Sequence, residues 1–281
     1  MGKRIIGSAI LMLATIYVFA QETQNVPVKN AFQGTVFINE QSANLVNNGE
    51  LILQIQHRFG DISYGIDQFF GLDLAVMRLG FVYGLAKNIN VGIGRSNMLK
   101  TYDASAKFRL MQQTDNMPIT MTATIEGSIP TIRNYFPASE NSFSNKVSGT
   151  AQLQIAKTMG IVGLQISPGY LHTGYLYNEQ SNYDLFTLGL AGSLKLSKHV
   201  SFNLEYLNPF EDKLQSNKPL SVGVDISTGG HIFQLMLTNS QGMINQALYT
   251  NTYGDWGKGH IYFGFNLIRK FKIRYTDEDY F

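Results

Sequence analysis

The chain has 281 residues, of which 44% are hydrophobic, 12% aromatic and 15% charged, and its formal net charge is +2. This composition excludes an intrinsically disordered protein, which has few aromatic residues and a high net charge, and it disfavours nucleic-acid binding. The absence of Cys excludes disulfides and thiolate-bound metals, and a mean hydropathy of -0.06 is too polar for a bundle of membrane helices.

The N-terminus, residues 1–20, has the pattern of a secretory signal peptide. Lys3 and Arg4 precede an almost wholly apolar run, residues 5–19, and the small Ala20 is followed by polar sequence. A basic start, an apolar run and a small residue at the cut are the features of a signal peptide, so we expect cleavage after Ala20. The alternative is an uncleaved membrane anchor, which needs about 20 apolar residues, more than this run contains.

Residues 21–48 form a polar stretch rich in Gln, Asn and Val. Only residues 35–38 within it have strand character. Two interpretations are open: the stretch is a periplasmic lead-in to the domain that follows, or it folds into that domain as a plug.

Alternation of apolar and polar residues dominates residues 49–275. In the segment that starts at Val200, for example, Phe202 and Leu204 alternate with Asn203 and Glu205. A period of two is the signature of a strand with two unlike faces. Twelve segments have this pattern, namely residues 51–56, 78–84, 89–94, 102–109, 119–126, 147–155, 162–171, 184–196, 200–207, 219–226, 231–238 and 259–268.

The connections between these segments alternate in length. Most connections after odd-numbered segments are long, whereas those after even-numbered segments are short, and residues 97–100 are the exception. Short periplasmic turns and long outer loops are typical of bacterial outer-membrane barrels, which have an even number of strands. We therefore expect an all-β fold, a closed antiparallel transmembrane β-barrel of about 12 strands over residues 49–275, with a C-terminal tail at residues 276–281. The alternative, a soluble β-sandwich, has no reason to sort its loops by length.

Several motifs in the first half resemble a known family. They are HRFGD at residues 57–61, RLGFVYG at 78–84, NVGIGRS at 90–96 and KTYD at 100–103, together with residues 35–42. In combination they are similar to the Gram-negative β-barrel family called domain of unknown function 5777, and the resemblance covers nearly the whole mature chain. It implies an outer-membrane barrel and supplies no reaction, ligand or catalytic residue.

The polar face of the predicted strands lines the lumen if the apolar face contacts lipid. The charged lumen-facing candidates lie in the first five segments and are Arg58, Arg78, Asp103, Lys107, Arg109 and Glu126. One interpretation is a basic ladder, answered by the two acids, that forms an anion-preferring constriction, because rings of charge set pore selectivity. The other is a salt-bridged network that fills a narrow barrel and conducts nothing.

Motifs that indicate an enzyme are scarce. The five His residues show no paired metal-binding spacing, and we expect no metal, no cofactor and no catalytic residue. One faint pattern is His199 with Ser201 and Glu205, which resembles the His and Ser pair of some barrel lipid hydrolases. A general base beside a hydroxyl is a chemically sensible arrangement.

The sequence therefore predicts a protein of the cell outer membrane, inserted into its lipid bilayer by the barrel-assembly machinery. The favoured function is a pore or channel for small solutes, whose identity the sequence does not give. The alternative is a closed barrel that is structural or binds a partner through its long outer loops, residues 128–146 and 239–258. A lipid hydrolase is a remote third possibility.

Overall fold

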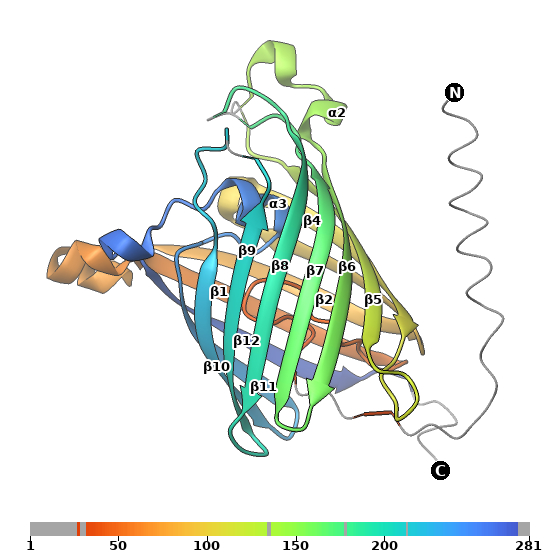
Figure 1. Cartoon of the computed structure of the whole chain (residues 1–281). Helices are drawn as coiled ribbons and strands as arrows, with labels where there is room; N and C mark the ends of the chain where they lie inside the picture. The colour runs from red at the N-terminus through yellow and green to blue at the C-terminus, as the bar shows by residue number, and fades with distance from the viewer. Residues whose placement is uncertain (1–26, 29–31, 134–135, 177–178, 212, 275–281) are drawn as a thin grey trace, which may run out of the picture.

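A closed, antiparallel barrel of twelve strands forms the protein (Figure 1), and the predicted fold class is confirmed. The computed structural model describes residues 27–28, 32–133, 136–176, 179–211 and 213–274. The expected signal peptide and C-terminal tail lie outside these residues. The strands are β1 (Glu50–Asp61), β2 (Ala75–Ala86), β3 (Ile89–Ser96), β4 (Thr101–Met111), β5 (Thr120–Pro130), β6 (Ser148–Met159), β7 (Val162–His172), β8 (Asp184–Lys195), β9 (Val200–Pro209), β10 (Leu220–Thr228), β11 (His231–Thr238) and β12 (Tyr262–Lys272).

Each strand pairs with its neighbours in sequence, and β1 pairs with β12 to close the barrel. At this seam Leu51 lies opposite Phe271, and Arg58 lies opposite Gly264. Closure leaves no strand edge unpaired, which is what a sheet needs in lipid, where no water can satisfy the backbone. In the part of the chain that the structure describes, no helix is both long and apolar enough to cross a membrane.

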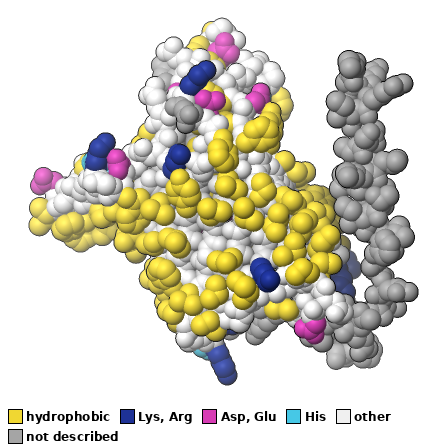
Figure 2. Space-filling view, viewed as in Figure 1, with side chains coloured by type: hydrophobic (Ala, Val, Ile, Leu, Met, Phe, Trp, Pro, Cys, Tyr) yellow, Lys and Arg dark blue, Asp and Glu magenta, His cyan; other side chains and the backbone are white. Residues whose placement is uncertain are grey.

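The two faces of each strand differ as the alternation predicts. On β9, Ser201, Asn203 and Glu205 are buried inside the barrel, whereas Phe202 and Leu204 are exposed on its outer wall. Figure 2 shows hydrophobic side chains spread over the wall, with few charged residues among them. An apolar exterior around a polar interior is the arrangement of a membrane barrel.

The strand connections sort by length in the same way as in the sequence. The turns after β2, β6 and β10 are two residues long, and Gly160 and Gly230 have positive φ in two of them. The opposite end carries the long loops and, within the described residues, the short helices η2 (Ile62–Gly71), η3 (Met98–Lys100), η4 (Ala138–Glu140), α2 (Phe143–Lys146), α3 (Asn245–Thr250) and η5 (Trp256–Lys258). Long loops mark the outer side of such barrels, so we call this end the outer end.

Residues 32–48, called here the inner segment, lie within the barrel. A tight turn is formed where Val36 bridges to Gln41, and the Phe37 amide donates to the Glu40 carbonyl at 2.8 Å. Ile38, at the tip of this turn, is almost fully buried. The apolar core is therefore inside the lumen, where the inner segment packs against the wall in the cluster Val36, Val46, Ile52, Ile232 and Ile268.

Candidate functional site

A buried carboxylate holds the tip of the inner segment. The Glu205 carboxylate, on β9, accepts hydrogen bonds from three consecutive backbone amides, those of Ile38, Asn39 and Glu40, at 3.2, 3.1 and 2.9 Å. The Asn39 side-chain amide adds a fourth at 2.9 Å. A buried charge is tolerated only when it is well hydrogen-bonded, so Glu205 and the tip satisfy one another.

A buried cation holds the same tip from another side. Arg58, on β1, is fully buried, and its Nη2 donates to the Ile38 carbonyl at 3.1 Å and to Asn39 Oδ1 at 2.9 Å. Asn266, on β12, also donates to the Ile38 carbonyl, at 2.9 Å. The wall therefore binds the amides of the tip with an anion and its carbonyls with a cation.

Lys107, on β4, holds the two arms of the inner segment. Its Nζ donates to the carbonyl oxygens of Thr35, Ser42 and Asn44 at 3.1, 2.9 and 3.3 Å. An ammonium group has three donors, and all three are used here. Lys107 thus ties together the chain that enters the turn and the chain that leaves it.

Arg78 and Asp103 form an ion pair within the wall. Arg78 Nε donates to Asp103 Oδ2 at 2.9 Å, and Arg78 Nη1 donates to Gln56 Oε1 at 2.8 Å. Gly80 and Gly94 give the guanidinium its space, because a Cβ at either position would collide with it. The pair thus reaches from β2 across β3 to β4, past Gly80 on β2 and Gly94 on β3, and Gln56 adds a contact from β1.

Glu126, on β5, binds a loop that enters from the outer end. Its Oε1 accepts the backbone amide of Asn245, the first residue of α3, at 2.9 Å. The Asn245 side chain donates to Gln152 Oε1 at 3.0 Å. Behind it, Tyr249 is fully buried. The connection between β11 and β12 therefore reaches down into the lumen.

The inner segment and this outer loop meet at Glu40. Its Oε1 accepts from Gln152 Nε2 at 3.1 Å and from the Tyr249 hydroxyl at 3.4 Å. Burial, with the nearby Glu205 carboxylate as the second cause, raises the pKa of Glu40 well above its usual range. The lumen is thus filled from both ends.

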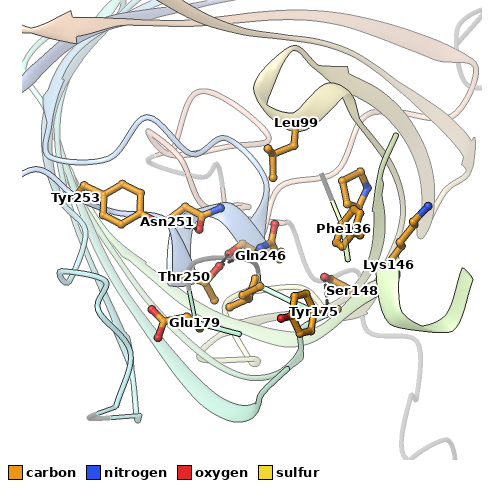
Figure 3. A pocket seen from close by; sticks show the side chains of 13 residues that line it. Leu99, Phe136, Lys146, Ser148, Tyr175, Glu179, Gln246, Thr250, Asn251 and Tyr253 are labelled. Carbon is orange, nitrogen blue, oxygen red and sulfur yellow. Dashed lines mark hydrogen bonds between the residues drawn. The ribbon is translucent and has the colours of Figure 1, made fainter. Parts of the chain in front are cut away.

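The free space at the two ends differs greatly. Figure 3 shows the pocket between the outer loops, where Gln246 and Thr250 of α3 face Tyr175 and Phe136. Its volume is about 20 Å³, enough for one water molecule. At the periplasmic end, a cavity of about 520 Å³ lies between the inner segment and the wall. The outer end is therefore the more tightly closed around α3, while a second cavity of about 240 Å³, lined by Glu140, Asn145 and Gln180, lies between the outer loops.

Arg109 lines this periplasmic cavity together with Lys270. Its Nη1 donates to Gln112 Oε1 at 3.0 Å, and its side chain is half-buried. Among the six charged candidates, Arg109 is the one nearest the short-turn end of the barrel.

The six candidates do not form one ladder. Arg78 is answered by Asp103, whereas Arg58 and Lys107 bind the inner segment and Glu126 binds α3. In the sequence, Glu205 stands out only beside His199 and Ser201 in the hydrolase-like pattern, and nothing there predicts that it anchors the tip of the inner segment. Its inward phase in an alternating segment was the one available signal.

The His and Ser pattern noted above falls into two separate environments. The Ser201 hydroxyl is buried in the lumen and accepts from Gln33 Nε2 at 2.8 Å. His199 is on an exposed turn, where its Nδ1 lies 2.9 Å from the Ser227 carbonyl oxygen. Glu205 is occupied by the inner segment. The described residues show no hydrogen bond between His199 and Ser201.

A closed barrel with an apolar exterior and a filled polar lumen defines a membrane-bound β-barrel of the outer-membrane type. The family model described as membrane bound beta barrel domain (DUF5777) matches residues 32–271, and the chain belongs to this family. The resemblance seen in the sequence is confirmed. The match begins at the first residue of the inner segment, so the segment is part of the family domain.

Solved structures of outer-membrane barrels are similar to this chain at low sequence identity. The NanC porin matches with a TM-score of 0.50 and 10% identity, covering 79% of this chain and 99% of that one. An outer membrane channel from Pseudomonas putida F1 matches at 0.45, with 12% identity and coverage of 81% and 97%. Omp33 from Acinetobacter baumannii matches at 0.43, with 8% identity and coverage of 79% and 98%. The NanC likeness supports the fold. None of the curated proteins compared with the chain matches it.

Proposed function

We propose that this protein is an outer-membrane channel for small polar solutes, and that the inner segment closes its lumen in the resting state. The observation that carries the proposal is the way the segment is held. Glu205, Arg58 and Lys107 bind it through polar atoms of its backbone. Water can replace each of these partners, so the wall is suited to a hydrated state as well as to the closed one.

The composition of the wall supports this proposal. The inward side chains that surround the inner segment are largely amides, hydroxyls and charges, such as Gln54, Gln154, Thr122 and Asn203. A barrel of twelve strands is too wide for its own side chains to fill in the way that an eight-stranded barrel is filled. Removing the segment would therefore leave a hydrophilic passage rather than a collapsed core.

Passage also requires the outer end to open. The connection between β11 and β12 carries α3 into the lumen, and Asn245 is held there by Glu126 and Gln152. An order–disorder transition of a segment is a common switching device in proteins. The proposed channel thus has two closures in series, the inner segment and α3.

Signal-peptide cleavage after Ala20 and insertion by the barrel-assembly machinery belong to the same proposal. The proposal also places the protein in the outer membrane of a Gram-negative cell, where the lipid bilayer surrounds the barrel. The channel function itself is tested by conductance in planar bilayers. We would compare the intact mature protein with variants that lack residues 32–46, residues 243–251, or both.

We expect the intact protein to be closed for most of the time and the double deletion to conduct steadily. Each preparation is first run on a gel, heated and unheated, because a heat-dependent shift shows that the barrel has folded. A folded double-deletion variant that stays silent at all salt concentrations and voltages would refute the proposal.

The tightly closed outer end favours a second candidate function, a closed barrel that binds a partner with its outer loops. The pocket beside α3 is too small for a solute, while side chains such as Phe143 on α2 are exposed on the outer loops. This candidate predicts a silent double-deletion variant, and a partner whose binding is lost when residues 131–147 are removed.

A further inference from the structure

The connection between β1 and β2 projects sideways from the outer end of the barrel. This connection, residues 62–74, is called here the lip. In Figure 1 it is the orange coil beside the blue η5, away from the other outer loops. Its large apolar side chains point into the surroundings, and Ile66 is the most exposed of them at 82%. The other exposed members are Tyr64, Phe69, Phe70, Leu72 and Leu74.

We propose that the lip lies in the outer leaflet of the membrane and binds the acyl chains of its lipids. The apolar surface of the lip is continuous with the lipid-facing wall. Leu74 is followed on β2 by Met77 and Leu79, all of them exposed on the outside of the barrel. Figure 2 shows the hydrophobic colour running from the wall along the lower edge of the projection. The bilayer that covers the wall therefore meets the lip without a break.

The lip is amphipathic. Its charged residues are Asp67 and Asp73, and the adjoining η5 adds the ion pair of Lys258 with Asp255 at 3.3 Å. In Figure 2 charged side chains and white, polar surface lie on the side of the projection opposite the hydrophobic edge. Amphipathic helices lie in the plane of the membrane interface with the apolar face about 5–10 Å deep, and we infer the same placement for the lip.

Several hydrogen bonds hold the lip in its projecting position. The Ile62 amide donates to the Ile261 carbonyl at 2.9 Å, and the Asp61 carboxylate accepts the Ser63 amide at 2.8 Å. His260 Nδ1 lies 2.6 Å from Asp61 Oδ2. The lip is thus tied to the connection between β11 and β12, and its apolar side chains are displayed from a supported frame.

Two neighbouring phenylalanines in the lip have an unusual backbone. Phe69 and Phe70 have φ of 45° and 55°, in the left-handed region that bulky residues rarely occupy. More than half of each of these two residues is nevertheless exposed. Strained conformations of this kind concentrate where a ligand or surface is bound, and acyl chains around the two rings supply the missing burial.

The experiment measures the depth of single tryptophans with brominated lipids, which quench indole fluorescence on contact. The native Trp256 is replaced by Phe, and Trp is introduced singly by Phe70→Trp and, as a second lip position, Phe69→Trp. Phe202→Trp on the lipid-facing wall is the positive control. Phe143→Trp, at a still more exposed position on α2 among polar neighbours, is the negative control. The full mature chain is refolded in phosphatidylcholine vesicles, and folding is checked by the heat-dependent gel shift.

We expect the lip tryptophans to lose at least half as much fluorescence to brominated lipid as Phe202→Trp, while Phe143→Trp loses almost none. Lip tryptophans that are quenched by aqueous acrylamide and not by brominated lipid would overturn the proposal. Lip tryptophans that neither agent reaches would also overturn it, since a second copy of the chain would then cover the lip. Agreement between the two lip positions guards against a local effect of either substitution.

Discussion

Glu205 and Asn39 are joined through two nitrogen atoms of Asn39, its backbone amide at 3.1 Å and its side-chain amide at 2.9 Å, although 166 residues separate them in the chain. One residue belongs to the wall and the other to the tip of the inner segment. Hydrogen bonds to a charged group are worth about 1.5–3 kcal/mol each. This single contact region is therefore a main determinant of whether the lumen is filled.

Glu205→Gln is expected to loosen the inner segment. The new amide group would point a donor at backbone amides that are themselves donors, and the negative charge would be lost. We expect a large rise in the fraction of time for which the channel conducts, measured in planar bilayers. Asp115→Asn, which makes the same change of charge on an exposed periplasmic turn, serves as the control. Equal behaviour of the two variants would contradict the role given to Glu205.

Arg78→Ala is expected to lower the stability of the barrel and to leave conductance unchanged. Removing one partner leaves the Asp103 carboxylate buried without its cation, which costs about 3–5 kcal/mol. Urea unfolding followed by the gel shift measures this loss. The double variant Arg78→Met with Asp103→Leu removes both charges and should recover much of it. A double variant no more stable than Arg78→Ala would show that the loss does not come from the unpaired charge.

Leu204→Arg tests which face of β9 lies in lipid. Leu204 is 47% exposed on the outer wall, and an arginine near the bilayer midplane costs about 2–4 kcal/mol. The free energy of unfolding from phospholipid vesicles gives the value. Leu204→Ile keeps the side chain apolar and should change it little. A nearly neutral arginine at this position would mean that the face is not in contact with lipid.

The raised pKa of Glu40 is expected to make closure of the lumen depend on pH. Because its pKa is raised when the inner segment is in place, the seated state binds a proton that the released state gives up. Closure is then strongest below the ordinary glutamate pKa of about 4.3, and it weakens as the pH rises from there toward the raised value. Conductance should therefore increase with pH across this window.

Glu40→Gln should flatten that pH profile, because the amide does not titrate. Bilayer recordings at a series of pH values compare the variant with the intact protein. A profile that is unchanged in the variant would assign the pH dependence to another group, and a conductance that falls with rising pH would contradict the expected sign.

The fold was predictable because the two faces of each strand lie in different surroundings. Lipid outside and polar surroundings inside impose alternation on segments such as residues 200–207, and the pleat converts that pattern directly into faces. The length of the connections then gave the direction of the barrel. The connection at residues 97–100 is short because a single turn, η3, joins β3 to β4.

The site was less predictable because its partners come from outside the alternating segments. Nothing in the pattern of β9 says that Glu205 will bind backbone amides of Ile38 and Glu40, since a backbone carries no sequence signature. Burial of Ile52 and Ile268 inside the lumen runs against the rule that the inward face is polar. These apolar positions mark where the inner segment packs, a relation that only the assembled barrel reveals.

The carbonyl oxygen of Ile38 accepts hydrogen bonds from Arg58 and from Asn266, which belong to the first and the last strand. The inner segment therefore links the two strands that close the barrel, and it also fills the lumen. Withdrawing it removes a shared partner from the two strands whose pairing makes the sheet a closed ring. In the proposed channel, a solute that displaces the inner segment also removes a contact shared by β1 and β12. The stability of the β1–β12 pairing therefore limits how easily the lumen can open.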